Sequence, residues 1–213
     1  TGLGTSDADS ITLLGHDLAT EILGKYSFGE LSYYLITKRR PTPGQLVMFE
    51  AVLASLADHG FTPTAIAARL TYASAPDSLQ GALAAGLLGG GSRFLGVTED
   101  CAHFLARELK EIGDAPTTQD GWDAAALNAV QKQRDIGKFV PGLGHPVHKQ
   151  GDPRTPVLIA MAREQGLFGS HLSLFEAIGR VHSQVLGKTL PLNGAGVCGA
   201  VLADAGIPMG VMR

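Results

Sequence analysis

The residues best suited to chemistry lie in a segment rich in glycine and proline, residues 140–154. This segment contains His145, Lys149 and Arg154. Glycine lets backbone N–H groups approach a ligand closely, and clusters of N–H groups favour anions. Arginine binds a carboxylate through two parallel hydrogen bonds, and histidine can donate to a carbonyl oxygen on which negative charge develops. The segment therefore predicts a site for a small polycarboxylate or a phosphate-bearing substrate.

Two further loops combine glycine with a cation or a potential cation. Residues 57–60 carry His59 after an apolar helical pattern, and residues 89–96 carry Arg93. Each loop has a purely structural alternative: the first is also typical of a helix C-terminus, and the second of a turn between packed helices. The second loop matches neither a P-loop nor a dinucleotide-binding fingerprint, because no Gly-Lys-Ser/Thr follows it and no strand precedes it.

The composition excludes several classes of protein. Of the 213 residues, 45% are hydrophobic and 17% are charged, which is incompatible with a disordered chain. The 17 Lys and Arg against 20 Asp and Glu give a formal charge of −3, so we expect no nucleic-acid partner. The apolar stretches end well short of the ~20 residues that a membrane span needs, so we also expect no membrane partner.

Cysteine and histidine spacing predicts no metal site. Cys101 and Cys198 form no CxxC pair, and His145 and His148 have no cysteine or carboxylate nearby at ligand spacing. Residues 1–17 contain no basic segment followed by an apolar one, as a signal peptide would. A reducing, cytoplasmic location is therefore expected.

The elements that must position these loops are predicted to be helices. Apolar residues recur with a period near 3.6, and no alternation of β-branched residues indicates a strand, so the predicted fold class is all-α. The 28 glycines lie among Ala- and Leu-rich segments, which favours closely packed helices. Thr98 is expected to cap the helix at 99–112. The predicted helices are 45–58, 63–72, 79–88, 99–112, 121–138, 155–165, 171–186 and 194–203.

The motif Gly142-Leu-Gly-His-Pro-Val-His-Lys149, followed by Asp152-Pro-Arg154, resembles the Gly-x-Gly-His-x-Val-x-Lys…Asp-Pro-Arg signature of the citrate synthase superfamily. Other segments resemble family elements in the same order and extend the resemblance over nearly the whole chain. These segments are residues 25–30, 31–37, 40–43, 58–60, 190–193 and 206–208.

Within the superfamily the sequence is more similar to citryl-CoA lyases than to synthases. Residues 91–96 resemble the Gly-Asp-Arg-Phe-Gly-Gly of the lyase module of ATP-citrate lyase, and Phe94 stands at or beside the first catalytic histidine of synthases. The family's catalytic aspartate, in Asn-Val-Asp, corresponds to Ala195, which cannot titrate. Asp204 follows nine positions later and is expected to be a poor substitute.

The resemblance implies a citrate-synthase-like multi-helical fold with two helical domains. Residues 1–95 would form the large domain, to which 200–213 return, and 96–199 the small one, with hinges at 89–91 and 190–193. It also implies a homodimer. The helix at 78–88 is apolar nearly all round, as expected of a helix buried on several sides.

The resemblance further implies an enzyme that makes or cleaves the C–C bond between acetyl-CoA and oxaloacetate. The alternative is a catalytically weakened relative that binds CoA esters or dicarboxylates. The partners would be acetyl-CoA or citryl-CoA and oxaloacetate or a related keto acid, with the CoA ester as substrate and no tightly bound cofactor. The implied roles are His145 and His59 in catalysis, Arg154, Arg93 and Asn193 in substrate binding, and Gly142, Leu143, Gly144 and Lys149 in CoA binding.

Overall fold

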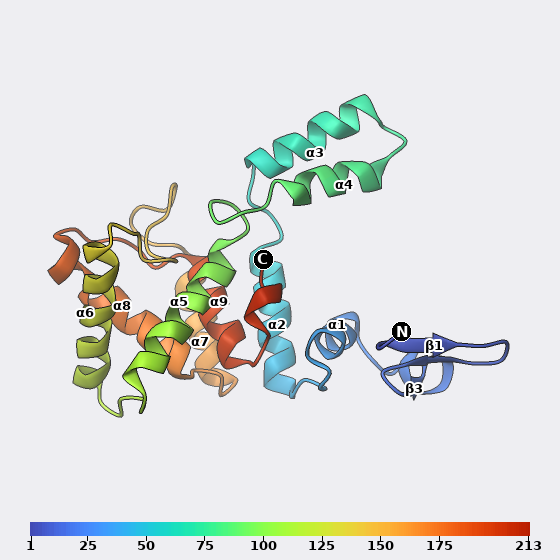
Figure 1. The fold of residues 1–213 in the computed structure, drawn as a ribbon, viewed down its shortest axis with the longest axis horizontal. Helices are drawn as coiled ribbons and strands as arrows, with labels where there is room; N and C mark the ends of the chain where they lie inside the picture. Colours follow the sequence, from blue (N-terminus) through green and yellow to red (C-terminus); the bar gives the residue numbers. More distant parts are fainter.

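The computed structural model describes all residues from 1 to 213, and its helices form the body of the molecule (Figure 1). The all-α prediction is confirmed. In chain order, the elements are β1 (Gly4–Ser6), β2 (Ile11–Leu13), β3 (His16–Asp17), the π-helical turn η1 (Leu18–Ile22), α1 (Phe28–Thr37), α2 (Pro43–Ser55), α3 (Pro63–Ser74), α4 (Leu79–Leu88), α5 (Val97–Ile112), α6 (Gln119–Asp135), α7 (Arg154–Glu164), α8 (Ser170–Leu186), α9 (Gly194–Asp204) and the 3-10 turn η2 (Met209–Val211).

The expectation that no strand occurs anywhere is wrong for the N-terminus. Strands β1, β2 and β3 form a small antiparallel sheet in which Gly4 pairs with Leu13 and Thr12 with Asp17. Asp7 closes the first turn, because its carboxylate accepts the backbone N–H groups of Asp9 and Ser10. Strands of two or three residues are too short to produce a recognisable period of two.

The predicted helices begin within two residues of the observed starts. The side chains of Ser27, Thr42, Thr62 and Thr118 each accept a backbone N–H in the first turn of α1, α2, α3 and α6. Thr98 is an exception: α5 already begins at Val97, and Thr98 is buried inside its first turn. Burial against neighbouring helices has therefore overridden the local capping signal there.

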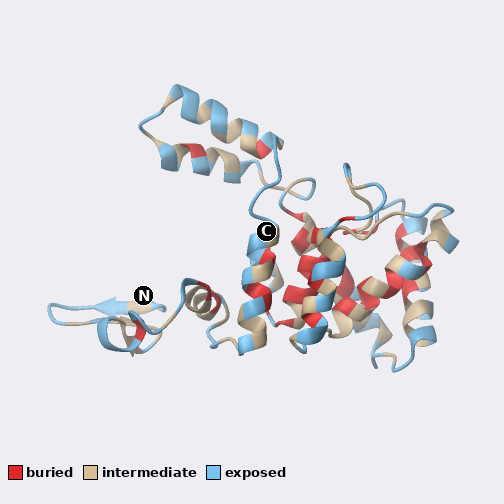
Figure 2. Ribbon diagram, turned by 180° about the vertical axis from the view of Figure 1, so that it is seen from behind, coloured by how far each residue is buried: buried red, intermediate tan, exposed pale blue.

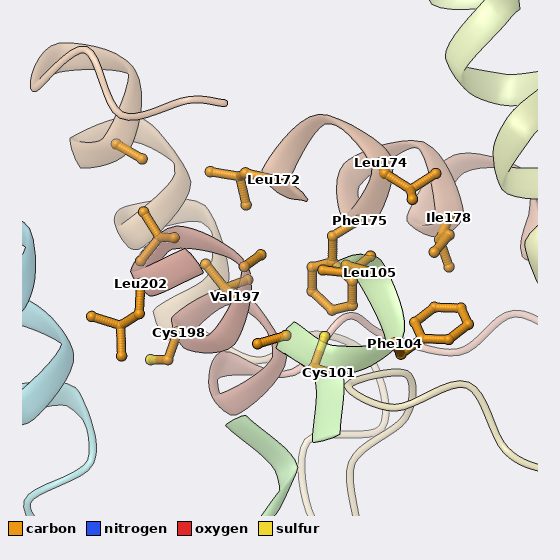
Figure 3. Packing of buried hydrophobic residues seen from close by; sticks show 14 of the residues in the cluster. Cys101, Phe104, Leu105, Leu172, Leu174, Phe175, Ile178, Val197, Cys198 and Leu202 are labelled. Atoms are coloured by element: carbon orange, nitrogen blue, oxygen red, sulfur yellow. The ribbon is translucent and has the colours of Figure 1, made fainter. Parts of the chain in front are cut away.

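The hydrophobic core lies where α5, α8 and α9 pack together (Figure 3). Leu105 of α5, Phe175 of α8 and Val197 of α9 are fully buried. Gly199 permits the contact between α9 and α5, since a Cβ there would lie 2.2 Å from the carbonyl oxygen of Thr98. The small residues of α9 thus allow a helix to run through the centre of the body, buried along almost its whole length.

Helices α3 and α4 form a hairpin that projects from the body, and its surface is mainly exposed (Figures 1 and 2). Only Thr64 and Ala82 are buried within it. Leu70, Leu83 and Leu87 expose 68%, 59% and 71% of their surface. Within one chain, the apolar helix α4 is therefore not buried on several sides, and it packs mainly against α3.

Every helix in the structure falls short of either the length or the apolar character needed to cross a lipid bilayer.

Candidate active site

A cavity of about 500 Å³ forms where the segment after α2, the loop before α5 and the loop before α7 meet. It brings together His59, His145 and Arg154, which come from three separate places in the sequence. Phe94 also lines it. The complete lining is Ser55, Asp58, His59, Gly60, Phe61, Thr62, Pro63, Phe94, His145, Pro146, Val147, His148, Pro153 and Arg154.

The ring of His145 is held by its own loop. Its Nδ1 atom accepts the backbone N–H groups of Val147 at 3.1 Å and His148 at 2.9 Å. In the neutral ring the proton must therefore sit on Nε2, the nitrogen that remains for a ligand. Burial lowers the pKa of His145 below its ordinary value; Asp152 opposes this effect, and His148 and Arg154 add to it. His145 is thus suited to be a neutral hydrogen-bond donor.

Two further imidazoles surround His145. The ring of His148 lies 4.5 Å from that of His145, and the ring of His59 lies 6.2 Å away and nearly perpendicular to it. The backbone of Gly60, with a φ of +67°, turns the chain directly after His59. Since α2 ends at Ser55, the segment 57–60 is a separate loop on the cavity rather than the C-terminus of that helix. Three imidazoles therefore lie within one short stretch of the cavity.

Arg154 is fixed by a fully buried carboxylate. Its Nε donates to Oδ1 of Asp152 at 3.0 Å and its Nη2 to Oδ2 at 2.7 Å, while Nη1 donates to the carbonyl oxygen of Ser55 at 3.1 Å. Each Nη atom keeps one unused N–H for a ligand. The backbone N–H of Gly194, the first residue of α9, also donates to Oδ2 of Asp152 at 2.7 Å. Asp152 therefore joins the arginine to the beginning of α9.

The pKa of the Asp152 carboxyl reflects this arrangement. Burial raises it, but the hydrogen bonds from Arg154 and from the N–H of Gly194 outweigh burial and hold it well below its ordinary value. Asp152 therefore carries its negative charge at neutral pH and keeps the Arg154 guanidinium oriented.

Asn193, Gly142 and Gly144 do not line the cavity; they support the His145 loop. Asn193 caps α9 by accepting the N–H of Gly196, and its Nδ2 donates to the carbonyl oxygen of Gly144 at 2.7 Å. Gly142 has a φ of +81°, and a Cβ there would lie 2.8 Å from both Gly196 and Phe175. The two loops also pair at Leu143 and Leu192. Asn193, Gly142 and Gly144 therefore set where the His145 loop sits on α9.

Arg93 and Lys149 are exposed and lie outside the cavity lining. The neighbour of Arg93, Phe94, does line the cavity. In this arrangement the only guanidinium on the cavity wall is that of Arg154.

Residue 195 contributes no charge, and Asp204 does not replace it. Ala195 lies in the first turn of α9, next to Gly194, whose Cα faces the Arg154 guanidinium. Asp204 is at the opposite end of α9, where its carboxylate accepts the N–H groups of Gly169, His171 and Leu172 and contacts His171 Nδ1 at 2.8 Å. Asp204 therefore stabilises the start of α8.

Three residues of this region, Ser55, Asp58 and Asp152, carry no predicted role in the sequence. Asp58 lines the cavity and accepts the N–H of Gly60. Its position directly before His59 could have signalled this. For Asp152, the signal was its position two residues before Arg154, at a helix start that contains Pro153. Ser55 contributes only a backbone carbonyl, for which a sequence has no signal.

Residues 10–212 match the family described as citrate synthase, C-terminal domain. No curated protein sequence gives a significant match. Among solved structures, citryl-CoA lyase from Hydrogenobacter thermophilus aligns with a TM-score of 0.85 and 30% identity. That alignment covers 99% of this chain and 78% of the lyase.

More distant structures share the fold. ATP citrate lyase from Methanothrix soehngenii, determined with citrate and coenzyme A, aligns with a TM-score of 0.80 and 24% identity. That alignment covers 99% of this chain and 33% of the ATP citrate lyase chain. Citrate synthase from Thermoplasma acidophilum aligns with a TM-score of 0.62 and 20% identity over 86% of this chain and 46% of the synthase. At these identities the comparison supports the fold alone.

Proposed function

The chain belongs to the citrate synthase family, and on that premise we propose that it is a citryl-CoA lyase or citrate synthase-like enzyme. Its substrates are citryl-CoA, or acetyl-CoA with oxaloacetate or a related keto acid. The CoA ester is a substrate, and no tightly bound cofactor takes part. The observation that carries this proposal is the convergence of His145, His59 and Arg154 on one cavity, in a chain 30% identical to a citryl-CoA lyase.

Cleavage of citryl-CoA breaks one C–C bond. A base of the cavity, for which Asp58, His59 and His148 are the candidates, takes the proton of the substrate hydroxyl group, whose oxygen becomes the carbonyl oxygen of oxaloacetate. The electron pair of the broken bond passes to the thioester as an enolate. The enolate carbon then takes up a proton and gives acetyl-CoA. The enzyme must therefore hold the carboxylates, stabilise the changing charge on one oxygen and supply a proton carrier.

We propose that His145 contacts the substrate oxygen that changes between hydroxyl and carbonyl. Support comes from its tautomer: with Nδ1 occupied by two backbone N–H groups, the neutral ring offers Nε2–H to the substrate oxygen. The hydrogen bond from this neutral donor becomes stronger as negative charge develops on the substrate oxygen.

We propose that Arg154 binds a carboxylate of the substrate and that His59 lines the same pocket. Each Nη atom of Arg154 keeps one N–H that can donate to a carboxylate oxygen, and Asp152 keeps the guanidinium from rotating. Arg93 and Asn193 are kept as proposed substrate contacts, and Gly142, Leu143, Gly144 and Lys149 as proposed CoA contacts. The exposed positions of Arg93 and Lys149 suit contact with the phosphates of a long substrate that extends out of the cavity.

The proton carrier differs from the family pattern. Ala195 cannot exchange a proton, and the titratable groups of the cavity besides His145 are Asp58, His59 and His148. Loss of a positioned acid or base costs about 10²–10⁴-fold in rate. The proposed enzyme is therefore slower than relatives that retain the aspartate, unless one of these groups takes over.

We further propose a homodimer in which the α3–α4 hairpin packs against a second copy. Support comes from the exposed Leu70, Leu83 and Leu87, which form part of an apolar surface that one chain leaves uncovered. Residues 1–95 with 200–213 would be the large domain and 96–199 the small one, hinged at 89–91 and 190–193. The cytoplasm is the proposed location, in agreement with two buried free thiols, Cys101 and Cys198.

The test is oxaloacetate release from citryl-CoA, coupled to a reporter dehydrogenase. We expect turnover in the wild type and a loss of about 10²–10³-fold in kcat for His145→Ala. The matched control is His103→Ala, an exposed histidine on α5, which should keep full activity. Absence of turnover in the wild type, with CoA-ester binding detected by calorimetry, would identify a binding protein instead. Equal activity of His145→Ala and the wild type would overturn the site assignment.

A further inference from the structure

A second cavity, of about 580 Å³, lies near the N-terminus between β3, η1 and α1, on a part of the chain that the proposed reaction does not use. It is lined by His16, Glu21, Lys25, Tyr34, Lys38, Arg39 and Arg40. Four of the 17 Lys and Arg residues of a chain with net charge −3 are therefore gathered around one hollow.

These four cations have no carboxylate partner. None of Lys25, Lys38, Arg39 and Arg40 takes part in an ion pair, unlike Arg163, Arg180 and Arg213 elsewhere in the chain. Glu21, the one acidic residue of the lining, is occupied by the backbone N–H of Asp17 at 2.7 Å and lies 3.4 Å from His16. With one carboxylate against four cations, the lining keeps an excess of positive charge.

The backbone turn after α1 brings these residues to the hollow. Lys38 ends α1 with a φ of +57°, a left-handed conformation that favours glycine and costs about 1 kcal/mol for a residue with a side chain. The Thr37 hydroxyl fixes the following turn by donating to the carbonyl oxygen of Arg39 and accepting its N–H. On the other wall, Lys25 follows η1 and donates to the carbonyl oxygen of Thr20 at 2.5 Å.

An aromatic stack orders the side chain of Arg40. Its guanidinium lies 4.2 Å above the ring of Tyr26, which in turn stacks on Tyr34 with ring centres 6.2 Å apart. A guanidinium held by its face on a ring keeps its N–H groups, which lie in its plane, free to bind an anion.

We propose that this cavity binds a small anion with two or more negative groups, either phosphates or carboxylates. Its volume falls within the range of about 300–1,000 Å³ typical of small-molecule sites. With four cations and one carboxylate around the hollow, a multivalent anion is the ligand that best relieves the repulsion among the cations. The proposal is independent of the chemistry at His145.

The experiment titrates the full chain with inorganic triphosphate in one arm and with tricarballylate, a tricarboxylate, in the other, by calorimetry. The arm that binds identifies the anionic group. Lys38→Ala/Arg40→Ala should weaken that binding about tenfold or more, and raising the salt concentration should weaken it in the wild type. Both residues are exposed, so this variant is expected to fold. The control, Lys110→Ala/Lys188→Ala, makes the same charge change at exposed lysines elsewhere and should bind like the wild type.

Lysine acetylation read by mass spectrometry locates the anion. Protection of Lys25 and Lys38 by the bound anion would support the proposal. Protection of Lys149 alone would place the anion at the His145 loop and overturn it. Absence of binding in both arms, or equal weakening in the control variant, would also overturn it.

Discussion

Asp152 and Arg154 form a two-point ion pair in which the Asp152 side chain is completely buried, while the Arg154 side chain, which lines the cavity, keeps 22% of its surface exposed. Because the carboxylate also accepts the N–H of Gly194, it links a cavity cation to the beginning of the central helix. Binding of a carboxylate to Arg154 would therefore cost little side-chain entropy, because the side chain is already ordered.

Asp152→Asn should lower the free energy of unfolding by about 2–3 kcal/mol, since it leaves a largely buried guanidinium without its counter-charge. Denaturant unfolding measures this loss. The control is Asp123→Asn, which breaks the surface pair between Asp123 and Arg180 and should cost less than about 1 kcal/mol. Equal losses in the two variants would show that burial of Asp152 contributes nothing.

The stabilisation by Asp152 should depend on pH. The pKa of its carboxyl is lower in the folded chain than the ordinary value of 3.8, so in acid the unfolded chain binds more protons. The stabilisation is therefore complete above that ordinary value and declines as the pH falls toward the lower pKa of the folded state. The difference in unfolding free energy between wild type and Asp152→Asn should shrink from about pH 5 to about pH 2. A difference that stays constant over this range would contradict the assignment.

Ala195→Asp should return a carboxylate to the first turn of α9. If the beginning of this helix faces the substrate methyl group, the rate of condensation or cleavage should rise by about 10²-fold or more. Ala195→Asn has nearly the same shape but cannot exchange a proton, and it should leave the rate unchanged. A gain with asparagine as large as that with aspartate would point to an effect of size or polarity rather than proton transfer.

The exposed leucines of α4 should be needed for the proposed dimer. Leu83→Arg/Leu87→Arg puts two charges on a surface that the single chain leaves bare, so it should dissociate the dimer without disturbing the core. Light scattering coupled to size exclusion compares its mass with that of the wild type. Leu53→Arg, also exposed but on α2, is the control and should keep the wild-type mass. A wild type of monomer mass would contradict the dimer.

The sequence by itself determined most helix boundaries and the position of the candidate site. Thr62 followed by Pro63, Asn193 before small residues, and Gly187 at the end of α8 act through hydrogen bonds and dihedral preferences within a few residues, so their effects are visible in the sequence. The same holds for His145 and Arg154, whose spacing carries the family resemblance.

Tertiary structure alone decided what those residues contact. Asp152 accepts the N–H of Gly194, which lies 42 positions further along the chain. Asp204 contacts the start of α8 because the 11-residue helix α9 places it at the opposite end from residue 195. The exposure of α4 likewise depends on which surfaces one chain can cover. Such outcomes depend on contacts between residues distant in the sequence, whose energies arise only when the helices pack, so no local pattern could encode them.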